Sequence, residues 1–150
     1  MAGAPSRTPR RGRRGEALPV NPKTILIADD SAAGREFLRS ALVHSGYRVI
    51  EAENGKQVLD LARAHAPDLI ILDIRMPVLD GLSTVTEIRR DPALLHLPVM
   101  ALTAFAMQGD REDALKAGFS RYVTKPVRLA SLREEVHALL YERSGPNPDS

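Results

Sequence analysis

The order of apolar and polar residues along the chain predicts five short strands that alternate with five helices. Short apolar runs bounded by turn-forming residues are typical of strands buried on both faces of a sheet. Segments with apolar residues at every third or fourth position are typical of helices with one buried face. The strands are expected at Thr24–Ala28, Tyr47–Ala52, Leu69–Asp73, Leu97–Leu102 and Phe119–Thr124, and the helices at about 31–44, 55–65, 81–90, 108–117 and 129–142.

The helix ends and the buried helix faces can be assigned from the same pattern. Ser31 and Asn54 are expected to cap the first two helices, Asp80-Gly81 to open the third, and Gly118 to end the fourth. Strict alternation of strands and helices implies parallel pairing with right-handed crossovers, hence an open sheet covered on both sides. The residues expected on the buried helix faces are Phe37, Leu38, Ala41, Leu42, Val58, Leu61, Ala62, Leu82, Val85, Ile88, Leu129, Leu132, Val136, Leu139 and Leu140.

Length and composition fit one ordinary domain. The chain has 150 residues, of which 43% are hydrophobic, enough to bury a core. There is no cysteine, which excludes disulfides and cysteine metal sites. No apolar run approaches the roughly 18 residues of a membrane helix, and the N-terminus lacks the pattern of a secretory signal. We therefore expect a cytoplasmic protein without a membrane span.

The positive charge is concentrated at the N-terminus. Residues 1–22 carry five arginines and one glutamate, a net charge of +4, which leaves −2 for the rest of a chain whose total is +2. This segment is rich in Arg, Pro and Gly and has little to bury, so it is expected to be a disordered tail. Clustered arginines are attracted to nucleic acid or acidic membranes, although a solvated leader is the simpler explanation of an Arg-rich run without interleaved aromatics. Salt-dependent nucleic-acid binding that is lost on removal of residues 1–16 would reveal such a role.

Five residues that can carry chemistry stand where the predicted strands end. They are Asp29, Asp30, Asp73, Thr103 and Lys125. Each alone also fits an ordinary cap or turn, but a parallel sheet brings the ends of all its strands to one edge. Crowded carboxylates need a shared cation, and oxygen ligands favour Mg²⁺. A lysine and a hydroxyl beside them would suit transfer of a phosphoryl group to a carboxylate.

The same positions carry a family resemblance. From Thr24 to about Tyr141 the sequence resembles the receiver domain of two-component response regulators, of the stand-alone, single-domain type. The matching motifs are Ile25-Leu26-Ile27-Ala28-Asp29-Asp30-Ser31, Leu72-Asp73-Ile74-Arg75-Met76-Pro77 with Asp80-Gly81, Ala101-Leu102-Thr103-Ala104, and Tyr122-Val123-Thr124-Lys125-Pro126. The resemblance implies a flavodoxin-like (βα)5 α/β fold, a doubly wound parallel five-stranded sheet with strand order 2-1-3-4-5. It also implies that Asp73 accepts a phosphoryl group from a sensor histidine kinase or a histidine phosphotransfer protein.

The resemblance assigns a role to each residue at the acceptor site. Asp30, Asp73 and the backbone carbonyl of Arg75 would bind Mg²⁺, and Asp29 would act through a bound water. Lys125 would pair with the phosphoryl oxygens and would precede a cis peptide bond. Two further residues would transmit the signal: Thr103 as a hydrogen-bond donor to the phosphoryl group, and Tyr122 as a switch aromatic. The output surface would be the helix from Gln108, the strand from Phe119 and the last helix.

The resemblance also sets domain limits and partners. Residues 23–143 would form the receiver, with disordered tails at 1–22 and 144–150. The last seven residues are too short to fold, so a complete chain would have no DNA-binding or enzymatic output domain and would act on a downstream protein target, with a weak homodimer left open. It would be no enzyme beyond its own phosphorylation and dephosphorylation. A receiver fragment of a hybrid histidine kinase is the alternative within this class.

Two alternatives from other classes use the same acidic residues. An aspartyl-phosphate hydrolase would require a second carboxylate two residues after its nucleophile, where this chain has Arg75. A flavin-binding module of the same topology would require a phosphate-binding loop after the first strand, where Asp29 and Asp30 would repel phosphate. Catalytic turnover of a phosphate ester, or a yellow purified protein, would favour one of these.

Overall fold

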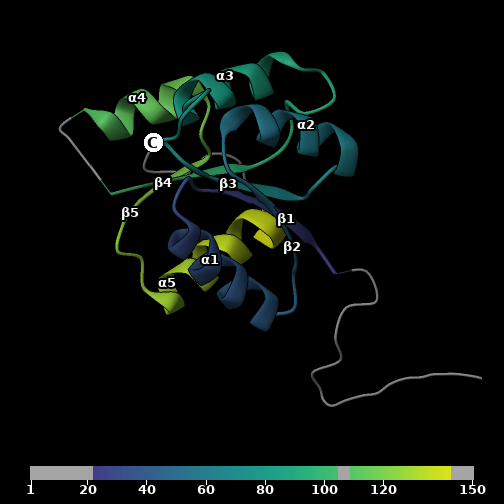
Figure 1. Cartoon of the computed structure of the whole chain (residues 1–150), viewed down its shortest axis with the longest axis vertical. Helices are drawn as coiled ribbons and strands as arrows, with labels where there is room; N and C mark the ends of the chain where they lie inside the picture. The colour runs from purple at the N-terminus through teal and green to yellow at the C-terminus, as the bar shows by residue number, and fades with distance from the viewer. Residues whose placement is uncertain (1–21, 105–108, 143–150) are drawn as a thin grey trace, which may run out of the picture.

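A five-stranded parallel sheet carries helices on both faces (Figure 1). The computed structural model describes residues 22–104 and 109–142. Its strands are β1 (Thr24–Ala28), β2 (Arg48–Ala52), β3 (Leu69–Asp73), β4 (Val99–Thr103) and β5 (Arg121–Thr124). Its helices are α1 (Ala32–His44), α2 (Gly55–His65), α3 (Gly81–Arg90), α4 (Asp110–Ala117) and α5 (Leu129–His137), which continues as a π-helical segment, Ala138–Glu142.

The strand order is β2-β1-β3-β4-β5, and all four pairs are parallel. The central strand β3 pairs on both sides, so that Ile71 lies opposite Ile27 on β1 and Met100 on β4. This confirms the order that the family resemblance implied, which the apolar pattern alone could not supply. Because every strand runs the same way, the carboxyl ends of β1, β3, β4 and β5 meet at one edge of the sheet.

Two apolar cores lie on opposite faces of the sheet. Figure 1 shows α2, α3 and α4 on one face and α1 with α5 on the other. Alternate residues of β3 divide between them, because successive side chains of a strand point to opposite faces. Ile70 and Leu72 pack under α2 and α3, whereas Leu69 and Ile71 pack against α1 and α5. A sheet covered on both faces leaves only its ends accessible, which makes the carboxyl edge the natural ligand site.

The predicted caps are present. The side chains of Ser31, Asn54 and Asp80 accept hydrogen bonds from backbone N–H groups in the first turns of α1, α2 and α3. Gly118 ends α4 with a φ of 126°. The first three residues thus mark where loops at the carboxyl edge end and helices begin, and Gly118 marks the end of a helix.

Three predicted strands start too early, and the reason is the same each time. The N–H groups of Tyr47, Leu97 and Phe119 donate to carbonyls of the preceding turns, those of Leu42, Leu94 and Ala114. Residues whose N–H closes a turn cannot enter the sheet ladder at that position.

For two helices the sequence-based prediction placed too many residues on the buried face. Phe37 of α1 is 43% exposed and Leu129 at the start of α5 is 40% exposed. Periodicity gives the direction of a helix's apolar stripe but not where the neighbouring element ends.

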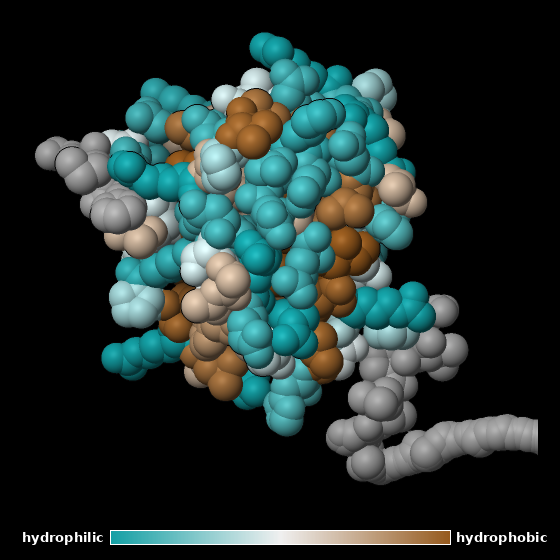
Figure 2. All heavy atoms as spheres, viewed as in Figure 1, coloured by the Kyte–Doolittle hydropathy of each residue, from teal (hydrophilic) through white to brown (hydrophobic). Residues whose placement is uncertain are grey.

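Some expectations concern residues outside those the structure describes. These are the tails, apart from Pro22 at the end of the first, and the predicted start of the fourth helix at Gln108. The face shown in Figure 2 is largely hydrophilic, with separate apolar groups. None of the described helices is long and apolar enough to cross a membrane.

Val78 in the loop between β3 and α3 has an unfavourable backbone conformation. Its φ is +69°, and the Leu79 N–H donates to the Pro77 carbonyl at 2.7 Å, a tight γ-turn. A β-branched residue is strained there, and the Val78 side chain is 76% exposed, so it contributes little packing. We expect Val78→Gly to raise the free energy of unfolding by about 1 kcal/mol, because relief of strain exceeds the entropy that glycine adds to the unfolded chain. Urea denaturation measures this difference.

The matched control is the same substitution in a helix. Val43 lies within α1 and is 51% exposed. Val43→Gly is expected to lower stability by several tenths of a kcal/mol, because glycine is a poorer helix former than valine. Equal losses in both variants would show that Val78 is not strained.

Candidate functional site

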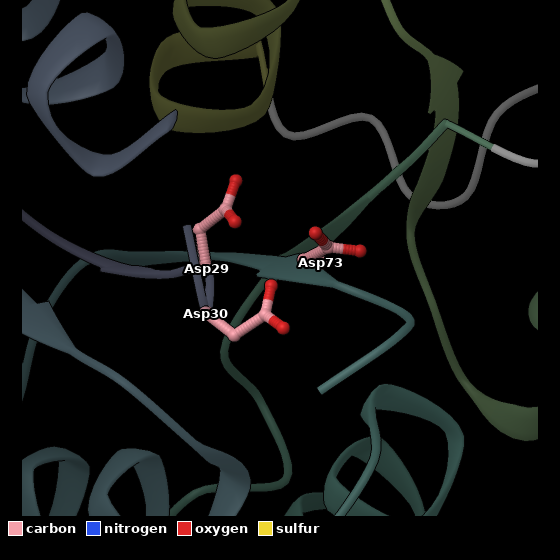
Figure 3. A group of neighbouring side chains, drawn as sticks. All are labelled: Asp29, Asp30 and Asp73. Carbon is pink, nitrogen blue, oxygen red and sulfur yellow. The ribbon is translucent and has the colours of Figure 1, made fainter. Parts of the chain in front are cut away.

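Three carboxylates meet at the carboxyl edge of the sheet (Figure 3). Asp29 and Asp30 directly follow β1, and Asp73 is the last residue of β3. One oxygen from each can be chosen so that all three lie within 4.8 Å of one another. Asp29 is 1% exposed and Asp73 7% exposed, whereas Asp30 is exposed. The sequence-based prediction that these residues converge is confirmed.

Lys125, which follows β5, reaches two of the carboxylates. Its Nζ donates to Asp29 Oδ2 at 2.8 Å and to Asp73 Oδ2 at 3.1 Å. Burial acts to lower the pKa of Lys125, but the hydrogen bond to Asp29 and the charge of Asp73 outweigh it and leave the pKa raised. The Lys125–Pro126 peptide bond is cis, as the resemblance implied. Lys125 therefore remains a cation that partly neutralises the acidic group.

Asp73 combines burial with two hydrogen-bond donors. The Arg75 backbone N–H donates to its Oδ1 at 3.0 Å, and Lys125 contacts its Oδ2. Burial raises the pKa of the Asp73 carboxyl, and the Arg75 N–H and Lys125 offset this only in part. Asp73 is thus a partly desolvated carboxylate held in a fixed orientation, which suits a nucleophile.

Asp29 and Asp30 point in different directions, as expected for consecutive residues of an extended chain. In Figure 3 the Asp29 carboxylate points towards α1 and α5, whereas the Asp30 carboxylate points towards Asp73. Asp29 Oδ1 accepts the Ser31 N–H at 2.9 Å. Within residues 22–104 and 109–142, no hydrogen bond or ion pair holds the Asp30 carboxylate. Asp30 is therefore the carboxylate that is open to an added ligand.

Two cavities lie beside this group. One, of about 550 Å³, has charged and polar residues beside apolar ones in its wall, and we call it the polar cavity; Thr103 lines it together with Asp30 and Arg75. The other, of about 530 Å³, is mostly apolar and has Asp29 and Lys125 in its wall. The polar cavity is the one that suits a charged ligand.

Thr103 and Tyr122 lie on the same face of the sheet. Thr103 ends β4 and is 2% exposed. Tyr122 on β5 pairs with Ala101, two residues before Thr103, and packs against the core under α4. Its hydroxyl oxygen is buried and has no hydrogen-bond partner among the described residues. Burial raises the pKa of Tyr122, and the nearby Asp110 adds to the effect.

Two residues that support the site were missed by sequence reasoning. Gly34 in α1 lies so close to the Asp29 carboxylate that a Cβ would overlap its Oδ2. Arg35 donates from Nη1 to the Asp29 backbone oxygen at 2.8 Å. A glycine inside a helical pattern was a signal for the first. No sequence signal marked Arg35, because its contact depends on where the helix crosses the end of β1.

Comparisons with known proteins agree with this geometry. The family model described as the response regulator receiver domain matches residues 25–137. The chain belongs to the response regulator receiver family. The polar-differentiation response regulator DivK of Brucella anthropi is 39% identical over 119 residues, which cover 79% of this chain and 97% of DivK.

Solved receiver structures have the same fold. The receiver domain of a sensor histidine kinase from Pseudomonas aeruginosa, with a magnesium ion coordinated in its active site cleft, matches with a TM-score of 0.75 and 36% identity over 80% of this chain and 98% of that one. The chemotaxis response regulator CheY4 of Vibrio cholerae matches with a TM-score of 0.75 and 26% identity, over 80% of this chain and 100% of that chain.

This receiver is therefore a phosphoacceptor of two-component signalling. Membership of the family implies interaction with histidine kinases or phosphotransfer proteins. It also favours a signalling protein over the hydrolase and the flavin-binding module that use similar residues.

Proposed function

We propose that Asp73 is the residue that accepts the phosphoryl group. One observation carries this proposal: Asp73 ends the central strand beside two other carboxylates, with the amine of Lys125 3.1 Å from its Oδ2. In the transfer, an Asp73 oxygen forms a bond to phosphorus while the bond from phosphorus to the donor's histidine nitrogen breaks. That nitrogen keeps the electron pair and takes up a proton. Lys125 would offset part of the charge that the phosphoryl group brings, about −1.5 to −2.

Mg²⁺ is the cofactor that the donor set fits. Asp30, Asp73 and the backbone carbonyl of Arg75 would hold it, and Asp29 would act through a water molecule. Hard oxygen ligands and an exposed Asp30 without a partner among the described residues agree with an ion that keeps several waters. When bound, Mg²⁺ neutralises negative charge on the transferring phosphoryl group.

The signal would pass from Thr103 to Tyr122. Thr103 lines the polar cavity and would donate its hydroxyl proton to a phosphoryl oxygen. Tyr122 shares its face of the sheet and has a buried hydroxyl without a hydrogen-bond partner among the described residues, so its side chain would be the one to respond. A single contact of this kind is worth about 1 kcal/mol, so it shifts a balanced pair of states rather than forcing a rigid one. The surface formed by α4, β5 and α5 would then bind a downstream protein.

Intact-mass spectrometry tests the phosphorylation chemistry directly. The full chain is incubated with acetyl phosphate and Mg²⁺, and a mass increase of one phosphoryl group is expected. The same mixture with EDTA should show no increase, because the carboxylates would repel the donor without a cation. Peptide mapping after reduction of the acyl phosphate should place the group on Asp73. Labelling in EDTA, labelling of another residue, or continuous turnover of the donor without a labelled protein would contradict the proposal.

A further inference from the structure

Arg35 connects the acidic site to the neighbouring edge strand. It lies near the start of α1, and its side chain is 16% exposed. Its Nη1 donates to the Asp29 backbone oxygen at 2.8 Å. Its Nε lies 3.5 Å from Glu51 Oε1 on β2, and its Nη2 lies 3.8 Å from Glu53 Oε2. The planar guanidinium thus contacts three partners through three different nitrogens, whereas a lysine would have only one nitrogen to offer them.

The hydrogen bond to Asp29 determines how the next residue is held. The Asp29 carbonyl belongs to the peptide group that links Asp29 to Asp30, so a donor on that oxygen fixes the plane of this peptide. The side chain of Asp29 is held separately, by Lys125 and the Ser31 N–H. The Asp30 carboxylate has no partner of its own among the described residues. Its direction towards Asp73 therefore depends on its backbone (Figure 3).

We propose that Arg35 is a positioning residue for the metal site, which acts by holding the Asp29–Asp30 peptide so that Asp30 faces Asp73. This inference rests on the proposed function, since it concerns the Mg²⁺ that Asp30 and Asp73 would share. Arg35 does not touch the ion or the phosphoryl group. Its effect passes through one peptide bond.

Positioning and simple electrostatics predict opposite results when Arg35 is removed. Loss of a positive charge near three carboxylates would by itself strengthen the binding of a cation. Loss of the hydrogen bond would release the Asp30 backbone and weaken binding. Changes in residues that orient a metal ligand usually reduce affinity by 10- to 100-fold. Since Glu51 and Glu53 already offset the charge of Arg35, we expect the positional effect to be larger.

The experiment compares Mg²⁺ binding by the full chain and its Arg35→Gln variant, using isothermal titration calorimetry. The dissociation constant is expected to rise about tenfold in the variant. The Mg²⁺ concentration that gives half-maximal labelling by acetyl phosphate should rise by the same factor. Thermal unfolding without Mg²⁺ is measured in parallel to show that both proteins are folded.

Arg39→Gln is the matched control. Arg39 lies one turn further along α1 and pairs with the other oxygen of Glu51, at 3.3 Å, but has no contact with Asp29. Its removal takes the same charge from the same ion-pair group, so Mg²⁺ binding should change by less than about twofold. If Arg35→Gln is unfolded, Arg35→Lys is judged by the same criterion, and weaker Mg²⁺ binding than in the parent is expected because one amine cannot replace the guanidinium's contacts.

The outcomes separate this inference from the function on which it rests. Weaker Mg²⁺ binding in Arg35→Gln, with Arg39→Gln close to the parent, supports the positioning role. Binding by Arg35→Gln that equals or exceeds that of the parent overturns it, as does an equal loss in both variants. A parent chain that neither binds Mg²⁺ nor is labelled would instead refute the proposed function.

Discussion

Asp73→Asn is expected to abolish labelling by acetyl phosphate and, in the same protein, to raise the stability of the metal-free domain by about 1 kcal/mol. Labelling is lost because an amide is not a nucleophile towards phosphorus. Stability rises because the carboxylate is 7% exposed and lies beside Asp29 and Asp30, so that without Mg²⁺ its charge is only partly compensated by Lys125. The asparagine side chain has one acceptor oxygen where the aspartate has two, so one of the hydrogen bonds from Lys125 and the Arg75 N–H is lost, which limits the gain in stability. Intact-mass spectrometry and urea denaturation in EDTA measure the two effects.

The stability gain should depend on pH in a defined direction. Burial raises the pKa of Asp73 above its ordinary value, so the folded parent binds a proton more readily than the unfolded chain does. The charged Asp73 carboxylate therefore destabilises the folded parent above the folded-state pKa. This loss of stability disappears as the pH falls through that value to the ordinary pKa of an aspartate. The stability advantage of Asp73→Asn should be full above the raised folded-state pKa of Asp73 and should vanish in acid.

Asp68→Asn is the control at the opposite end of the same strand. The Asp68 carboxylate accepts the Thr24 N–H at 2.8 Å, far from the acidic group. Its replacement should leave labelling intact and bring no gain in stability. A stability gain in both variants would point to a general effect of net charge, and labelled Asp73→Asn protein would remove Asp73 from its proposed role.

Gly55→Ala is expected to lower the free energy of unfolding by about 3 kcal/mol, the upper part of the usual range for overpacking. Gly55 is the first residue of α2, and its N–H donates to the Leu79 carbonyl at 3.1 Å. A Cβ there would overlap Thr84 Oγ1 and the Leu79 carbonyl oxygen and would lie 3.0 Å from Leu79 Cβ. Backbone atoms cannot yield as a flexible side chain does, so the loop between β3 and α3 must shift. Urea denaturation gives the change.

Gly109→Ala separates crowding from backbone strain. Gly109 has a φ of +88°, but a Cβ added to it would meet none of the described residues within 4 Å. Its replacement should therefore cost only the conformational strain, about 1 kcal/mol. Gly55→Ala protein no less stable than Gly109→Ala protein would show that α2 and the neighbouring loop adapt without cost.

The sequence predicted the sheet edge and its chemistry because both depend on local signals. Asp29, Asp30, Asp73, Thr103 and Lys125 each follow or end an apolar run, and parallel strands bring such positions together. Contacts between helices and strand ends have no such signal. The hydrogen bond from Lys125 to Asp29, which is shorter than that to Asp73, and the hydrogen bond from Arg35 depend on how α1 and β5 sit at this edge.

The strand order and the limits of burial were also beyond the apolar pattern. A run such as Leu69–Asp73 shows that a strand is buried but not which strands flank it. The exposure of Phe37 depends on how far α1 extends beyond the sheet on which it packs. This extent is set by the whole fold and not by the local sequence. The roles given to Thr103 and Tyr122 came from the family resemblance and stay predictions.

Asp29 faces the protein interior and Asp30 faces water. The contacts of Asp29 are therefore internal to the protein, whereas Asp30 is open to bind and release a ligand. Asp29 and Lys125 stay bonded to each other in the resting protein, whereas the Asp30 carboxylate breaks no bond within the described residues when it receives an ion. An incoming Mg²⁺ would therefore meet Asp30 without breaking a bond of that carboxylate, whereas Asp73 would share oxygens that already accept from Lys125 and the Arg75 N–H. At Asp30 the main cost of binding Mg²⁺ would then be the release of water from the tightly held hydration shell of the ion.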